Sequence, residues 1–412
     1  MKIKKQLKNI CSFCKDDLEK EFLDLNKTPL ANSYTNNPLK LKKHNLKLFF
    51  CKNCLLVQHN TKLNGENIFS DYQYFSSYSS NFVALAKKNV LNLIKTYKLG
   101  SKNTVIEIAS NDGYLLKHLK KIDINFYGIE PAKNIAEIAN KRGIKTINEY
   151  LNKKTAIEII KENPKGDLII ANNVFAHVPK IDEFIKSIKI LMTEKSIVCI
   201  EVPHLLNLIK NKQFDTIYHE HFFYLSLLSI RKMFNSNEMK IINVDKIKTH
   251  GGSLRVHITK IKNKIKINDN VKKILTEETN YNLKNIKSYI TFSASIYKLR
   301  EEIINFFNKN SKKNIYGFGA AAKSCTLINF CSLNLNKIKY IYDETPAKIG
   351  KYIPGTDIKI IKFGKNLPNK IDIIIIFPWN HLTEIKNKIE KITINKIKLV
   401  TLIPTVKEHT IN

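Results

Sequence analysis

The chain has 412 residues, enough for two or three domains, and its 43% hydrophobic and 25% charged residues are typical of a globular protein. It contains no apolar run of 18 residues, so we expect no membrane span. The net charge of +33 would suit a nucleic-acid-binding protein, but lysine supplies nearly all of the 69 basic residues and is spread along the chain. We therefore expect no nucleic-acid partner.

The N-terminal region contains two Cys-x-x-Cys pairs, Cys11 with Cys14 and Cys51 with Cys54. Four thiolates make a closed tetrahedral site, so this spacing predicts structural zinc and a reducing, cytoplasmic location. Two separate redox motifs are the alternative, but neither pair lies in a βαβ pattern. The basic N-terminus has no apolar segment of the kind found in a secretory signal.

An aromatic, hydroxyl-rich stretch follows at residues 69–79 and includes Tyr72. It is too polar for a core strand. We interpret it either as a hydrogen-bonding surface or as a surface turn before a helix over 81–95.

Residues 104–203 alternate between strand and helix patterns. Strands are predicted at the start of 104–119, at 125–130, near 145, at 167–175 and at 196–203. Helices are predicted after the first turn and at 133–141, 153–161 and 181–192. This alternation predicts a parallel, doubly wound α/β sheet.

The first turn of this sheet, 109–113, reads ASNDG, and the second strand ends at Glu130. An acidic residue at that place can accept both ribose hydroxyls of NAD(P) or of S-adenosylmethionine. Because the turn lacks the glycines that a dinucleotide pyrophosphate requires, we favour the methyl donor. The predicted cofactor-binding residues are Glu107, Ala109, Asn111, Asp112, Gly113, Glu130 and Asn172.

Polar residues follow the later strands, at Asn172, Asn173 and His177 and at 201–204. Ligands of open α/β sheets lie at the carboxyl ends of strands, so these residues are expected to face the site. A capping or surface histidine is the alternative for His177.

The stretch YHEHFFY, residues 218–224, places two imidazoles, a carboxylate and two phenols close together. It lacks the HExxH spacing and an obvious third ligand, so a zinc protease site is excluded. On an extended chain His219 and His221 would share one side, opposite Glu220, whereas a loop would let all of them converge. A half-buried strand and a general base remain open.

The C-terminal half contains THGGSLRVHI at 249–258, an amphipathic region at 268–310 and a second strand–turn–helix pattern, YGFGAAAKS, at 316–324. A buried strand is predicted at 372–380. These features predict a second, smaller α/β domain. Backbone amides and Lys323 at its first turn indicate an anion site or a plain tight turn.

In order along the chain, the motifs CxxC…CxxC, PLANSY, SNDGYLL, YGIEPA, NNVFAH, YHEHFFYLS, HGGSLR, YGFGAAAKS and PWN resemble the sugar C-methyltransferases that act on nucleotide-linked keto-deoxysugars. The resemblance implies a zinc-binding lobe (1–70), an S-adenosylmethionine-dependent methyltransferase domain of class I (71–245) and a Rossmann-like domain that contributes to sugar-nucleotide binding (246–412). It also implies a monomer whose zinc is held by the four cysteines.

The same resemblance implies that His221 removes the proton next to the substrate ketone. Its companions would be Tyr218 and Glu220, and Tyr72, Asn173 and His177 match further active-site positions. One departure is Ala109, where many methyltransferases have glycine; a methyl group is tolerated there if φ is negative. A nicotinamide-dependent oxidoreductase and a zinc-ribbon nucleic-acid methyltransferase are the alternative functions.

Overall fold

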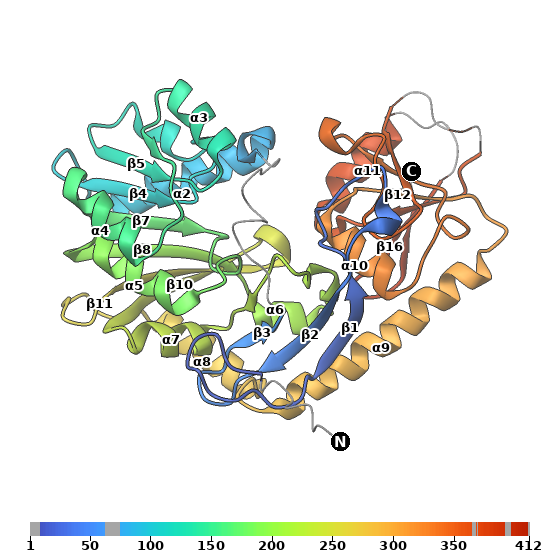
Figure 1. The fold of residues 1–412 in the computed structure, drawn as a ribbon, viewed down its shortest axis with the longest axis horizontal. Coiled ribbons are helices and arrows are strands. Elements are labelled where there is room, and N and C mark those ends of the chain that lie inside the picture. The colour runs from blue at the N-terminus through green and yellow to red at the C-terminus, as the bar shows by residue number, and fades with distance from the viewer. Residues whose placement is uncertain (1–8, 62–74, 365–367, 369, 392–396, 411–412) are drawn as a thin grey trace, which may run out of the picture.

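The computed structural model describes residues 9–61, 75–364, 368, 370–391 and 397–410. Three units, each built on its own β-sheet, lie along the molecule (Figure 1). Tyr72 and most of the aromatic stretch before Phe75 lie outside the described residues. Within the part that is described, every helix is too short or too polar to traverse a bilayer.

The N-terminal lobe is a four-stranded antiparallel sheet in the order β1-β2-β3-β9. Its strands are β1 (Leu23–Thr28), β2 (His44–Phe50), β3 (Val57–His59) and β9 (Phe223–Tyr224). Because side chains alternate along β2, Leu46, Leu48 and Phe50 enter one core while Phe49 packs with the cysteines in another. The last strand, β9, comes from the YHEHFFY stretch, so this segment is part of the N-terminal sheet.

The central sheet has the order β10-β11-β8-β7-β4-β5-β6. Five strands are parallel: β4 (Thr104–Ile108), β5 (Asn125–Ile129), β6 (Thr146–Ile147), β7 (Gly166–Asn172) and β8 (Met192–Pro203). The strands β10 (Met239–Ile247) and β11 (Ser253–Lys260) form an antiparallel hairpin, in which β11 pairs with β8. The predicted doubly wound sheet is confirmed, and it extends past residue 245 because β11 returns to it.

Helices cover both faces of the central sheet (Figure 1). Val105 of β4 packs with α2 (Ser80–Tyr97), while its neighbour Ile106 packs with α5 (Ile181–Leu191) and α7 (Leu227–Asn235). Helices α3 (Lys133–Lys141) and α4 (Lys153–Glu162) belong to the same unit. Helix α6 (Leu205–Lys210) instead packs in the core that the N-terminal lobe shares with the C-terminal domain. Burial on both faces explains the continuous apolar runs of the parallel strands.

The helix expected directly after β4 is absent from the described structure, and this prediction was wrong. Turns lead instead into one short 3-10 helix, Leu116–Leu119. Ala109 (φ 53°), Asn111 (φ 51°) and Gly113 (φ 77°) adopt left-handed conformations, which interrupt the right-handed backbone that a helix requires. A side chain at Gly113 would also meet Ile144 within 2.9 Å.

The C-terminal domain is a six-stranded sheet in the order β14-β13-β12-β15-β16-β17, which confirms the second α/β domain. Its parallel strands are β12 (Ile315–Phe318), β13 (Tyr340–Asp343), β14 (Lys359–Lys362), β15 (Ile373–Ile376) and β16 (Lys398–Thr401). The antiparallel β17 (Lys407–His409) closes one edge, and α10 (Ala322–Phe330) and α11 (Leu382–Glu390) pack against the sheet.

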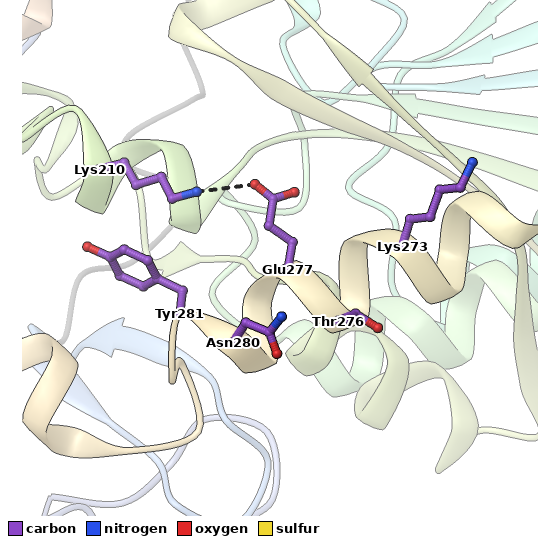
Figure 2. A pocket seen from close by; sticks show the side chains of 6 residues that line it. All are labelled: Lys210, Lys273, Thr276, Glu277, Asn280 and Tyr281. Atoms are coloured by element: carbon purple, nitrogen blue, oxygen red, sulfur yellow. Dashed lines mark hydrogen bonds and ion pairs between the residues drawn. The ribbon is translucent and has the colours of Figure 1, made fainter.

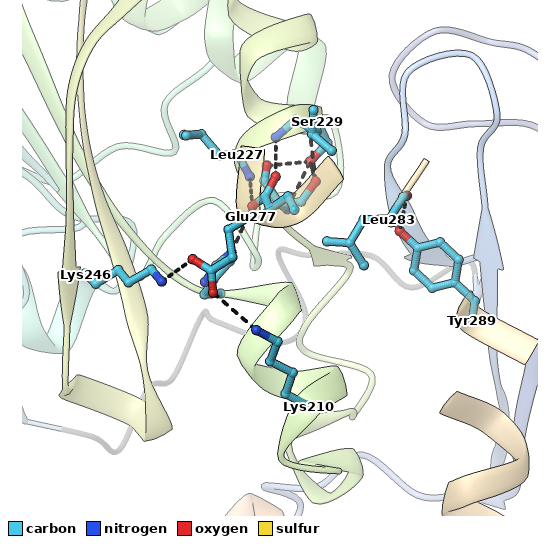
Figure 3. A network of polar contacts seen from close by, with 11 residues as sticks. Lys210, Leu227, Ser229, Lys246, Glu277, Leu283 and Tyr289 are labelled. Atoms are coloured by element: carbon cyan, nitrogen blue, oxygen red, sulfur yellow. Dashed lines mark hydrogen bonds and ion pairs between the residues drawn. The ribbon is translucent and has the colours of Figure 1, made fainter. Parts of the chain in front are cut away.

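Two helices, α8 (Asp269–Asn280) and α9 (Ile286–Lys309), connect the central and C-terminal domains, and α9 runs beside β1 (Figure 1). Glu278 of α8 is fully buried, and its carboxylate accepts the amides of Leu227 and Leu228 at 2.7 and 2.8 Å and contacts His204 at 2.8 Å. Figure 3 shows Glu277 on the outer side, paired with Lys210 and Lys246. Helix α8 is therefore fixed to the N-terminus of α7.

One hydrophobic core, which includes Phe49 and Leu56, joins the N-terminal lobe to the central sheet. A second core joins the N-terminal lobe to α9 and the C-terminal domain. It includes Leu46 of the N-terminal lobe, Phe214 of the segment before YHEHFFY, Tyr289 of α9 and Ile328 of α10. The three units therefore do not pack as independent domains, and YHEHFFY lies where they meet.

Candidate active site and metal centre

The four N-terminal cysteines meet at one point. Their Sγ atoms lie within 4.8 Å of one another, with Cys11 to Cys54 at 3.5 Å and Cys14 to Cys51 at 3.4 Å. Tetrahedral zinc with Zn–S bonds of about 2.3 Å requires sulfur separations near 4 Å, so the cluster fits this ion. Gln58 donates to the Cys11 Sγ at 3.2 Å and thereby orients this ligand.

The two cysteine pairs use the same local turn. The residue after each pair, Lys15 and Leu55, is left-handed with φ of 66° and 64°, and its amide donates to the carbonyl of the first cysteine. The turn directs both thiols of a pair to one side. Cys54 is only 3% exposed, and four cysteine ligands would leave no open coordination position. Such a closed site is typical of structural zinc.

The predicted cofactor residues gather at the carboxyl ends of β4, β5 and β7. The Glu130 carboxylate accepts the amide of Asn111 at 2.9 Å and that of Ala132 at 2.9 Å. Burial raises the pKa of Glu130 to about 6. The bond to Asn111 holds the turn 109–113 against the end of β5, where Gly128 leaves room for Ser110.

Several buried polar atoms around this turn have no hydrogen-bond partner among the described residues. They are Glu107 Oε2, Ser110 Oγ, Asp112 Oδ1, Asn172 Oδ1 and Asn173 Oδ1. Burial raises the pKa of Glu107 well above its usual value. Since orphaned buried polar atoms are rare in native proteins, this concentration indicates the place of a polar ligand.

The expectation for Ala109 requires a correction, because its φ is positive. A left-handed alanine costs about 1 kcal/mol relative to glycine. Nearby, Asp112 is held by Arg142, whose Nη1 donates to Oδ2 at 2.9 Å. The amide of Ser76 donates to Asn111 Oδ1 at 2.8 Å, so the end of the aromatic stretch covers this turn.

YHEHFFY is a loop up to Phe222 and a strand only at Phe223–Tyr224, so the extended interpretation was wrong for the two histidines. His219 turns toward the N-terminal lobe, where its Nε2 lies 3.2 Å from the Asn45 carbonyl and its ring contacts His44 and His59. His221 turns the opposite way, toward His177. The two imidazoles are thus distinguished by the fold.

His221 is held in one tautomer. Its Nδ1 donates to the Thr216 carbonyl at 2.9 Å, which leaves Nε2 as the acceptor for the Tyr218 hydroxyl at 2.8 Å. Burial lowers the pKa of His221 well below 6.5, so the ring is neutral at pH 7. The pair is therefore arranged to accept a proton.

His177 lies in the loop between β7 and α5, which packs against the loop that contains Glu220. The His177 Nδ1 donates to the Glu220 carbonyl at 2.8 Å, and its ring lies edge-on to His221 with centroids 4.7 Å apart. Burial lowers the pKa of His177 to about 4. The Glu220 carboxylate instead accepts the amides of Ala31 at 3.4 Å and of Asn32 at 3.0 Å.

Glu220 therefore attaches the PLANSY segment to the active-site loop and makes no hydrogen bond to His221 in the described structure. Asn173 follows β7 with φ of 56°, and its amide donates to the Glu201 carbonyl at 2.7 Å. Asn173 and His177 lie at the same sheet edge as the cofactor residues. The surface hollow beside α8 in Figure 2 contains none of these residues.

Comparisons with known proteins agree with this arrangement. Three family models match consecutive regions: a zinc binding domain over 11–69, a methyltransferase domain over 78–244 and a C-methyltransferase C-terminal domain over 248–404. The chain is 27% identical over 399 residues to the C-methyltransferase NovU of Streptomyces niveus. The match covers 96% of this chain and 95% of that protein. The chain is an S-adenosylmethionine-dependent methyltransferase with a C-methyltransferase C-terminal domain.

Among solved structures, the chain is similar to magnesium protoporphyrin IX methyltransferase from Synechocystis PCC 6803 with bound SAM. The identity is 15%, the match covers 48% of this chain and 98% of that one, and the TM-score is 0.35. A SAM-dependent methyltransferase from Aquifex aeolicus shares 16% identity, with coverage of 48% and 98% and a TM-score of 0.34.

In this C-methyltransferase, S-adenosylmethionine fits the orphaned polar atoms at the ends of β4 and β7, and Glu130 is the acidic residue beside them. The zinc in the cysteine cluster is structural. Its four ligands leave no open position for a substrate, and the cluster is part of the core on which Phe49 and Leu56 pack.

Sequence reasoning missed three residues beside this site: His250, Asp215 and Trp379. His250 lies in the loop between β10 and β11 and interacts electrostatically with His177 and His221. Trp379 of the C-terminal domain donates from Nε1 to Asp215 Oδ2 at 2.7 Å. The glycine pair after His250 was the available signal, because it marked a special turn.

Proposed function

We propose that this C-methyltransferase methylates the carbon next to the ketone of a nucleotide-linked keto-deoxysugar, with the Tyr218–His221 pair as the base and His221 as the final proton acceptor. The hydrogen-bonded pair of Tyr218 and His221, joined at 2.8 Å, is the observation that carries the proposal. The resemblance of the quoted motifs to the sugar C-methyltransferases supports the substrate class.

The pair explains how a weakly acidic carbon is deprotonated. A proton on the carbon next to a carbonyl is acidic because the carbanion is delocalised as an enolate. The Tyr218 oxygen accepts that proton while its own proton passes to the His221 Nε2. The products are an enolate and an imidazolium whose Nδ1–H is stabilised by the Thr216 carbonyl.

The low pKa of His221 has two consequences for its role in accepting a proton. Burial disfavours the imidazolium, so the ring is unprotonated and ready at neutral pH. The same burial makes proton uptake costly, and the negative enolate formed beside it offsets that cost. S-adenosylmethionine, held at the ends of β4, β5 and β7, supplies the electrophilic methyl group.

The neighbouring residues position the substrate and close the site. Asn173 has an unsatisfied Oδ1, and His177 lies edge-on to His221, so both are placed to contact the sugar. Glu220 fixes the loop to Asn32. The C-terminal domain supplies Lys323, whose charge acts on His221.

Product analysis tests the proposal. The zinc-loaded protein is incubated with labelled S-adenosylmethionine and a panel of nucleotide-linked keto sugars, and the methylated carbon is located by NMR. We expect transfer to a carbon adjacent to the ketone. Transfer to oxygen or nitrogen, or to nucleic acid in preference to every sugar, would refute it.

A further inference from the structure

A third imidazole, that of His250, is close enough to His177 and His221 to interact with them electrostatically. It belongs to the loop between β10 and β11, and its ring contacts Phe82 of α2 edge-on at 6.3 Å. Residue 250 is exposed to solvent, yet the surrounding protein atoms lower its pKa.

This loop is fixed from the central domain. The Thr249 hydroxyl donates to Glu201 Oε1 at 2.8 Å, and Arg255 holds the other oxygen of Glu201 at 3.1 Å. The Gly252 carbonyl accepts the amide of His204 at 3.1 Å. These bonds come from β8 and β11, which also position Asn173 through Glu201.

His250 itself has a left-handed backbone, with φ of 52° and ψ of 30°. That conformation costs about 1 kcal/mol for a residue with a side chain. Such strain persists only where the surroundings impose it, and it concentrates at functional sites.

Trp379 of the C-terminal domain packs closely against Gly251, the residue after His250. A side-chain carbon at Gly251 would meet Trp379 Cη2 at 2.5 Å and Gln213 Nε2 at 2.9 Å, so only glycine fits. Gln213 donates to the Gly251 carbonyl at 2.9 Å. Trp379 is fixed by Asp215, and the Lys323 ammonium lies 4.2 Å from its ring centroid.

The ring nitrogens of His250 have no hydrogen-bond partner within the described ranges. The other two imidazoles already use Nδ1, His221 on the Thr216 carbonyl and His177 on the Glu220 carbonyl. His250 is therefore the imidazole among these three whose N–H is not directed to the protein backbone.

We propose that His250 is a further catalytic residue, whose neutral imidazole donates an N–H hydrogen bond to the substrate ketone oxygen as the enolate forms. When Tyr218 and His221 remove the carbon-bound proton, the electrons of that bond move into the new C=C bond and those of C=O move onto oxygen. A donor directed at this oxygen stabilises the charge where it develops. Trp379 positions His250 by packing on Gly251. The inference rests on the proposed function.

The test separates deprotonation from methyl transfer. With S-adenosylhomocysteine bound, the enzyme cannot transfer a methyl group, and exchange of the sugar proton with D₂O reports enolate formation alone. We expect His250→Ala to lower both this exchange and kcat by about 100-fold, which is the usual effect of losing one such donor. His250→Gln, which keeps an N–H donor, should recover about tenfold of that loss.

Two controls exclude a merely structural effect. S-adenosylmethionine affinity, measured by calorimetry, should change less than twofold in both His250 variants. His381→Ala, which removes an exposed histidine near Trp379, should leave exchange and kcat unchanged. Trp379→Ala should lower exchange and kcat but leave S-adenosylmethionine binding intact.

Exchange and kcat within twofold of the original enzyme in His250→Ala would overturn the assignment while leaving the proposed function in place. Equal loss in His250→Gln and His250→Ala, together with weakened S-adenosylmethionine binding, would reduce His250 to a structural residue. If the unchanged enzyme methylates none of the keto sugars, the proposed function fails first, and the role of His250 fails with it.

Discussion

Two turns of this protein follow one plan and serve different ends. After β4, Glu130 accepts the turn amide of Asn111 and the amide two residues beyond itself. After β12, Asp343 does the same with Ala320 at 2.7 Å and Thr345 at 2.8 Å. An acidic residue that ends the second strand thus fixes the first turn in both sheets.

The difference lies in what satisfies each turn. The first is surrounded by orphaned polar atoms, whereas residues 319–323 and Asp343 have none in the described structure. There the Ala320 carbonyl accepts from Tyr34 at 2.6 Å and from Lys348 at 2.8 Å, and Lys323 donates to Asn380 at 2.7 Å. Groups of the protein itself therefore satisfy the polar atoms of the second turn. We assign the cofactor to the first turn and the assembly of the domains to the second.

The largest expected effect concerns the catalytic base, which belongs to neither of the two turns. His221→Ala should lower turnover of a keto sugar by about 1,000-fold, because a positioned base contributes this much. S-adenosylmethionine affinity should stay within twofold, as measured by calorimetry. His219→Gln is the matched control from the same loop, and it should retain turnover because His219 faces the N-terminal lobe. Equal losses in both variants would contradict the base assignment.

A matched pair of substitutions tests the assignment of the two turns directly. Glu130→Gln should weaken S-adenosylmethionine binding by about 30-fold, since a hydrogen bond to a charged group contributes about 2 kcal/mol. Asp343→Asn should leave that affinity unchanged. Calorimetry with each variant decides, and weaker binding in Asp343→Asn alone would reverse the assignment.

The pH dependence of binding sharpens the same point. Burial raises the pKa of Glu130 to about 6, so its carboxylate becomes protonated as the pH falls through this value. The neutral acid accepts hydrogen bonds less well, and S-adenosylmethionine should bind about tenfold more weakly at pH 5 than at pH 8. In Glu130→Gln this pH dependence should vanish. Persistence of the full dependence would assign it to another group.

The smallest expected effect compares backbone strain in the two turns. Ala109→Gly should stabilise the protein by about 1 kcal/mol, because φ is 53° there. Gly319→Ala should destabilise it, because φ is 90° and a new carbon would lie 2.2 Å from Pro378 Cγ. Thermal unfolding measures both. A destabilised Ala109→Gly would show that the methyl group packs usefully enough to outweigh the strain.

The sequence by itself determined what depends on local spacing and periodicity. The two cysteine pairs predicted the metal cluster, because each Cys-x-x-Cys makes its own turn. The alternation of strands and helices predicted both α/β sheets, and the turn before Gly113 with Glu130 predicted where the cofactor residues gather.

Only the tertiary structure decided which histidine faces His177. His219 and His221 are two residues apart, and their directions depend on Asn45 and Thr216, which belong to different units. Glu220 contacts Asn32, 188 residues away, and Gly251 meets Trp379 across the domain boundary. Such contacts follow from packing three sheets against one another, and no pattern within a short window encodes them.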